Sequence, residues 1–278
     1  LMNLRGAPPN PPTLQATFQG TVPLESSGTG GGRLIASTRD LSHLRRFLDP
    51  IPAPARGPLS EVIAQSPEAE LTLEGDLSWK QGVIGLDGQV RSGPLTLRGV
   101  KLGEMHADLQ ADPRSLDLRK LSLSGGEVPL DVEGAWRDSG EFRLAGDVGN
   151  LPVDWLKEWI AQDWPVEGRL TATLDLKGNL DRPAGSVDFR VDEPRLASVP
   201  LNLAEGRIVL GEDVVTVESF KAIRDAGEIT VVGSLGLRGK PIQLDAEGKN
   251  LDLKWLHDAG LVPEEVAGPI AVKAQLRG

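Results

Sequence analysis

The chain has 278 residues, a formal net charge of −10 and no cysteine. This acidic balance disfavours nucleic acid as a partner and polybasic attachment to anionic lipid, because both need clustered positive charge. The lack of cysteine excludes disulfides, thiol catalysis and cysteine-ligated zinc. With 33 glycines, 21 prolines, five phenylalanines and no tyrosine, the composition predicts frequent turns and an aliphatic interior.

Alternation of apolar and polar residues is the dominant pattern along the chain. Successive side chains of a strand point to opposite faces, so a period of two predicts strands with one apolar and one polar face. Turn residues recur about every ten positions, among them Gly88, Gly93-Pro94 and Gly103, which is typical of an antiparallel meander. The clearest alternating segments, in chain order, are 71–73, 95–97, 105–109, 116–123, 128–132, 170–177, 186–192, 208–210, 215–217, 229–237 and 242–244.

Helical spacing of apolar residues is confined to short segments. It predicts helices near 41–48, 151–160 and 251–259, the last two with Asn150 and Asn250 as N-caps. Residues 26–32 are rich in glycine and residues 50–58 in proline, so both segments are expected to be loops.

An internal repeat with an offset of 100 residues links these segments, because Asn150-Leu151 recurs at Asn250-Leu251 and Gly168 recurs at Gly268. The repeat unit is a short helix followed by several strands. We therefore predict a partial repeat over 1–40, full repeats over 41–150 and 151–250, and the start of a third over 251–278.

The repeated strands resemble those of the TamB/AsmA-like family. The resemblance rests on GRLTATLDLKGNLDRPAGSVDFRV at 168–191, on VVGSLGL at 231–237 and on NLDLKWL at 250–256. It implies an elongated, curved open sheet, shaped like a gutter or β-taco, with an apolar concave face. Members of the family are anchored in the inner membrane of diderm bacteria, cross the periplasm and are implicated in moving phospholipid to the outer membrane. One member has an outer-membrane barrel partner. On this resemblance the chain is expected to be an internal piece of a longer, periplasmic protein of the cell envelope.

Motifs for catalysis or for cofactor binding are not evident in the sequence. The three histidines are isolated, and without cysteine partners they make a metal site improbable. Carboxylates such as Glu104, Asp108, Asp112, Asp117, Asp188, Asp192 and Glu193 fall on polar positions of strands or in turns, where a solvated surface explains them best. We therefore expect no enzyme activity, no catalytic or metal-binding residue and no cofactor.

The leading hypothesis is an all-β, mainly antiparallel protein that shields phospholipid acyl chains on one apolar face. The residues predicted to line that face are Leu170, Leu174, Leu176, Val187, Phe189, Val191, Ile208, Leu210, Val231, Leu235 and Leu244. One alternative is a structural or adhesive β-repeat whose apolar face is closed by a second sheet. Another is a polysaccharide-active enzyme, which would need paired carboxylates at inward positions that are aliphatic here.

Overall fold

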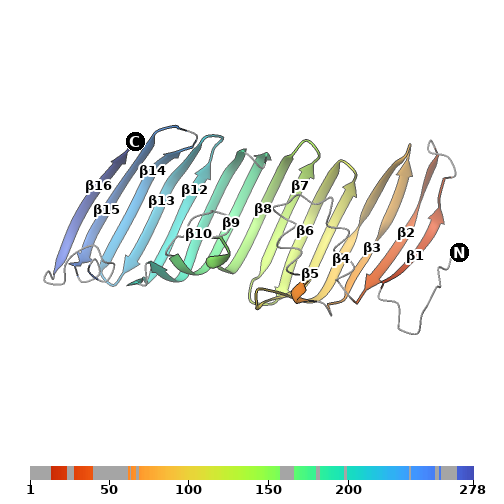
Figure 1. The fold of residues 1–278 in the computed structure, drawn as a ribbon, viewed down its shortest axis with the longest axis horizontal. Coiled ribbons are helices and arrows are strands. Elements are labelled where there is room, and N and C mark those ends of the chain that lie inside the picture. Colours follow the sequence, from red (N-terminus) through yellow and green to blue (C-terminus); the bar gives the residue numbers. More distant parts are fainter. Residues whose placement is uncertain are drawn as a thin grey trace. The chain divides into compact units, whose positions relative to one another are not determined.

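The structure is a computed structural model of the chain, and it is almost entirely antiparallel β-strand. It describes residues 14–23, 28–39, 62, 64–66, 69–156, 166–179, 182–196, 199–237, 239–253, 257 and 268–278. Within these residues the chain forms two compact units, 1–140 and 141–278. Each contains an open antiparallel sheet whose strands follow one another in chain order (Figure 1). The expected all-β, open-sheet fold class is thus confirmed.

The first unit contains strands β1 to β7, each paired with the next in the chain. Tight hairpins join several of them, and Gln81 and Gly82 between β3 and β4 both have positive φ, as a two-residue hairpin turn requires. The bounds are β1 Leu14–Thr21, β2 Thr29–Thr38, β3 Leu71–Lys80, β4 Val83–Leu97, β5 Val100–Asp112, β6 Ser115–Gly125 and β7 Leu130–Arg137.

The second unit contains strands β8 to β16 in the same consecutive order, except that the two-residue β11 pairs only with the end of β10. The bounds are β8 Glu141–Pro152, β9 Val166–Asn179, β10 Arg182–Leu196, β11 Val199–Pro200, β12 Leu203–Leu210, β13 Val214–Arg224, β14 Gly227–Gly236, β15 Ile242–Asp252 and β16 Pro269–Arg277.

Several residues predicted to be turns lie inside strands instead. Gly93 and Pro94 lie within β4, at a β-bulge in its pairing with β5. Gly103 lies within β5 next to a second bulge and has a φ of 80°. Gly88 sits in β4 directly opposite Gly75 of β3. A bulge accepts glycine and proline as readily as a turn does, so residue type alone did not separate the two.

The predicted helix N-caps are also wrong in detail. Asn150 belongs to β8 and adopts φ of 55° at a bulge, and Leu151 and Pro152 are still paired with β9. The helical turn begins later, at Asp154–Leu156, and the rest of 151–160 lies outside the described residues. Asn250 repeats this behaviour in β15 with φ of 51°, so asparagine serves here as a left-handed residue of a bulge and not as a cap.

The remaining helix predictions are only partly covered by the structure. Leu251 and Asp252 are strand residues, Leu253 and His257 are helical, and the other residues of 251–259 lie outside the described part of the chain. All of 41–48 also lies outside the described part of the chain.

The repeat of 100 residues is present in the backbone as well as in the sequence. The Val153 N–H donates to the Gly168 carbonyl at 3.1 Å, and the Leu253 N–H donates to the Gly268 carbonyl at the same distance. Both glycines have positive φ, 135° and 125°. The two turns that follow β8 and β15 are therefore closed by the same backbone hydrogen bond. Each glycine lies near the start of the following strand, as the third residue of β9 or directly before β16, in a conformation that most side chains disfavour.

Candidate functional site

The strand pairing of the second unit places all eleven predicted apolar residues on one face of the sheet. Directly opposed residues of antiparallel strands share a face, and Leu170 opposes Val191, which in turn opposes Ala204 of β12. The same reasoning, applied from each strand to the next, reaches Leu244 on β15 through a bulge in β13 that shifts its pairing with both β12 and β14. Whether this face binds lipid remains a prediction.

Four rows of residues cross this apolar face perpendicular to the strands, and none contains a charged or polar side chain. From β8 to β15, row 1 is Leu151, Leu170, Val191, Ala204, Ala222, Ile229 and Gly248; row 2 is Val148, Ala172, Phe189, Gly206, Phe220, Val231 and Ala246; row 3 is Gly146, Leu174, Val187, Ile208, Val217, Gly233 and Leu244; row 4 is Leu144, Leu176, Gly185, Leu210, Val215, Leu235 and Ile242.

Row 1 is largely covered by other side chains of the protein. Val153, in the turn after β8, folds onto Val191 and Ala204, and these three residues form a buried cluster at 8%, 6% and 6% exposure. Ala222 and Ala172 are buried close by, at 4% each. Val191 is therefore a core residue of the unit, although the sequence alone placed it among ligand-facing positions.

Row 2 contains an aromatic pair that straddles a glycine. Phe189 and Phe220 oppose Gly206 from the two neighbouring strands, and their ring centroids lie 6.5 Å apart. A Cβ atom on Gly206 would lie 3.0 Å from Cζ of Phe189 and 2.6 Å from the Ser219 carbonyl oxygen. Glycine is thus needed for the Phe189 ring to lie against the sheet, where it borders the buried cluster.

Rows 3 and 4 differ from row 1, because every residue in them is half-buried and none is fully buried. Among the residues that the structure describes, each strand makes its substantial contacts only with its neighbours in the sheet. Within the described ranges, no second sheet therefore packs on this face. Rows 3 and 4 form a continuous, partly exposed aliphatic band across seven strands, and this band is the candidate site.

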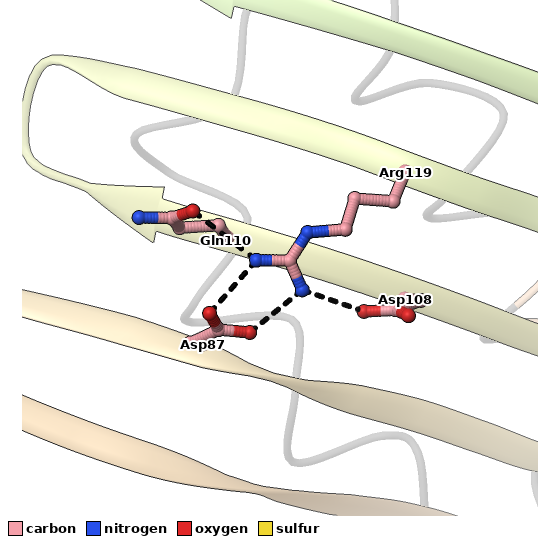
Figure 2. A network of polar contacts seen from close by, with 4 residues as sticks. All are labelled: Asp87, Asp108, Gln110 and Arg119. Atoms are coloured by element: carbon pink, nitrogen blue, oxygen red, sulfur yellow. Dashed lines mark hydrogen bonds and ion pairs between the residues drawn. The ribbon is translucent and has the colours of Figure 1, made fainter.

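The opposite face of each sheet is polar and carries ion pairs between strands. In the first unit the Arg119 guanidinium donates two hydrogen bonds to the Asp87 carboxylate, at 2.7 and 2.8 Å, and others to Asp108 and Gln110 (Figure 2). Arg119 is the extra residue of a bulge in β6, which lets it reach across β5 to β4. The hydrogen bonds from Arg119 lower the pKa of Asp87 below its ordinary value.

A hollow of about 560 Å³ lies on the polar face of the second unit, over β9 to β13. Each of its three cations is held by a carboxylate: Arg190 by Asp192 at 3.1 Å, Arg207 by Asp188 at 2.9 Å and Lys221 by Glu228 at 2.8 Å. The residues that line it are Thr171, Ala172, Thr173, Asp188, Phe189, Arg190, Glu205, Gly206, Arg207, Ser219 and Lys221. Because the cations are compensated, the hollow does not select an anion.

Five of the seven carboxylates considered for catalysis, Asp108, Asp112, Asp117, Asp188 and Asp192, make local polar contacts. Asp112 accepts hydrogen bonds from the Arg114 N–H at 2.7 Å and the Ser115 hydroxyl at 2.9 Å, which lowers its pKa. Asp117 pairs with Arg137 at 2.8 Å. Among the described residues, no group of three or more metal-binding side chains is assembled, and no helix has the length and apolarity of a membrane span.

Comparison with known proteins yields no relative: no family model, no curated protein and no solved structure matches this chain. The functional assignment therefore rests on the chemistry of the apolar face and on the sequence motifs that resemble the TamB/AsmA-like family.

Proposed function

We propose that the chain binds and shields the acyl chains of phospholipid on the apolar face of its sheet, along rows 3 and 4 of the second unit. The observation that carries the proposal is the aliphatic band itself, which is partly exposed and has no second sheet over it in the described residues. Contiguous apolar surface that stays open to solvent is a candidate interaction site in a soluble protein.

The dimensions of the band suit a hydrocarbon chain that lies across the strands. Neighbouring strands are about 4.8 Å apart, so the seven strands from β8 to β15 span roughly 29 Å. Rows 3 and 4 are separated by two residues along each strand, which is about 7 Å. An acyl chain can lie along this shallow band and touch branched side chains throughout.

The energetics favour binding without fixing one position. Complete burial of a methylene contributes about 0.8 kcal/mol, and an open face covers about half of each one, so each methylene contributes about 0.4 kcal/mol. Ten methylenes in contact therefore contribute roughly 4 kcal/mol. Because rows 3 and 4 offer no polar group, a bound chain loses little when it moves by one strand, and this suits lipid in transit.

The resemblance to the TamB/AsmA-like family supports the setting of this activity. In our proposal the chain is part of a periplasmic bridge between the inner and outer membranes, anchored in the inner membrane and assisted by an outer-membrane barrel protein. Lipid binding by the apolar face does not depend on these partners and can be tested alone.

A fluorescent phospholipid added to the purified chain tests the proposal. We expect saturable binding that is displaced by unlabelled phospholipid and not by its water-soluble headgroup. If the probe fails to bind the folded protein, the apolar face is covered in solution, and the structural or adhesive repeat becomes the better account.

A further inference from the structure

The two ends of the strands differ in how the apolar face of the second unit is covered. At the row 1 end, two buried clusters fill the space over the sheet, one around Val153 and one in which Val199 and Leu251 are 2% and 4% exposed. Rows 3 and 4 lie toward the other end, where hairpins join β9 to β10, β12 to β13 and β14 to β15. A lipid in the band therefore extends toward the hairpin end, because the row 1 end is filled.

The hairpin end has a gap at Gly178, one step beyond row 4 on the apolar face. Phe142 of β8 and Pro183 of β10 oppose Gly178 of β9 from its two sides. A side chain is disfavoured at Gly178, because its φ is 116° and a Cβ atom would lie 2.7 Å from the Arg182 carbonyl oxygen. Strand β9 ends one residue later, at Asn179. An acyl chain that leaves row 4 can therefore pass over the end of the sheet between Phe142 and Pro183.

Three cations lie beside this gap, on the polar face of the sheet. Arg143 of β8 directly opposes Lys177 of β9, and Arg182 of β10 opposes Asn179, two residues further along β9. All three cations are exposed, and no hydrogen bond or ion pair joins their side chains to another described residue. Like charges in direct opposition destabilise a sheet, and this chain has a net charge of −10. The cluster is therefore a local site of uncompensated positive charge.

The carboxylates on the same strands do not pair with these cations. Glu141 opposes Asn179 and Asp175 opposes Ser186, and neither carboxylate forms an ion pair with a described residue. The cation at the hairpin between β14 and β15 behaves differently, since Lys240 pairs with Asp213 at 3.2 Å. At the hairpin end of the second unit, the cluster of β8 to β10 thus stays available to an external anion.

We propose that Arg143, Lys177 and Arg182 bind the phosphate of a phospholipid whose acyl chain lies along rows 3 and 4. This inference rests on the proposed function and adds the position of the headgroup to it. Guanidinium groups donate paired hydrogen bonds to phosphate oxygens, and an ammonium group adds a further charge. The phosphate lies on the polar side of the sheet end, and the acyl chain passes Gly178 to reach row 4. The cluster holds a lipid at one position of a band that otherwise offers no polar contact.

Two fluorescent lipids with identical acyl chains, a phosphatidylglycerol and a diacylglycerol, test this assignment in titrations of the full chain. The phosphatidylglycerol should bind more tightly, because only it carries a phosphate. The double variant Arg143→Gln, Lys177→Gln should weaken phosphatidylglycerol binding about tenfold and leave diacylglycerol binding unchanged. Lys249→Gln is the matched control, since it removes an exposed cation of β15 that pairs with Glu247 at 3.7 Å, and both affinities should stay the same. Far-UV circular dichroism checks that the variants fold.

The outcomes separate this inference from the proposed function. If both lipids bind but the double variant retains the affinity for phosphatidylglycerol, or loses affinity for both lipids equally, the phosphate site is wrong and lipid binding stands. If neither lipid binds the original chain, the proposed function fails as well. Inorganic phosphate, followed by phosphorus NMR, provides the third measurement. Phosphate binding to the original chain, together with equal affinities for the two lipids, would show that the cluster takes free phosphate and would overturn the lipid assignment.

Discussion

A charge placed at the centre of row 3 should weaken lipid binding strongly. Ile208 is half-buried on β12, the middle one of the seven strands that cross the band. In Ile208→Glu a carboxylate replaces the aliphatic contact, and the acyl chain must lift away from this strand and its neighbours. If about five half-covered methylenes lose contact, the loss is about 2 kcal/mol, or roughly thirtyfold in Kd.

Fluorescent phospholipid titration of the purified variants measures this change, and the adjacent residue supplies a matched control. Val209 is also half-buried and aliphatic, but it lies on the polar face between Ser186 and Thr216. Val209→Glu should therefore bind lipid like the original chain. Equal Kd values for the two variants would refute the assignment of the binding face, provided that both keep the circular dichroism of the parent.

Three further outcomes follow from packing and charge. Val191→Ala should lower the free energy of unfolding by about 2 kcal/mol in urea titrations, because two methyl groups leave a buried cluster; a change near zero would contradict its burial. The pKa of Asp87 is lowered by Arg119, so the contribution of this pair is present above the unfolded pKa of about 3.9 and is lost as the pH falls through the folded value. In Asp87→Asn the free energy of unfolding should therefore depend less on pH in the acid range. An unchanged pH dependence would count against the pair. Gly88→Ala should destabilise the first unit by about 1 to 3 kcal/mol, since its Cβ would lie 2.6 Å from a backbone oxygen, while Gly93→Ala in the same strand meets nothing closer than 3.5 Å; equal thermal midpoints would refute this argument.

The sequence predicts the faces of the sheet well, because the period of two is a direct consequence of strand geometry. Leu170, Leu174 and Leu176 had to share a face once β9 was recognised, and short connections made the next strand its neighbour. The antiparallel order and the common apolar face of β8 to β15 follow from those two facts.

The sequence could not show which apolar residues the protein uses for its own core. Val191 and Leu174 have equivalent positions in the alternating pattern, yet only Val191 is covered by Val153. That contact depends on how the chain turns after Asn150, and asparagine is favoured both at helix N-caps and in left-handed bulges. Reading Asn150 as a cap placed the helix three residues too early and hid the turn that covers row 1.

The alternation of apolar and polar residues also does not predict the β-bulges, although these position important side chains. Arg119 bonds to Asp87 two strands away because a bulge in β6 offsets it from its neighbours. An arginine among many surface charges gives no sequence signal of such a role.

Native mass spectrometry of the chain purified from cells, with extraction and identification of bound lipid, tests the central claim most directly. We expect phospholipid to accompany the chain and its Val209→Glu variant, and to be lost from Ile208→Glu. A folded chain that is free of lipid, and that also fails to take up added phospholipid, would contradict the account and favour a purely structural repeat.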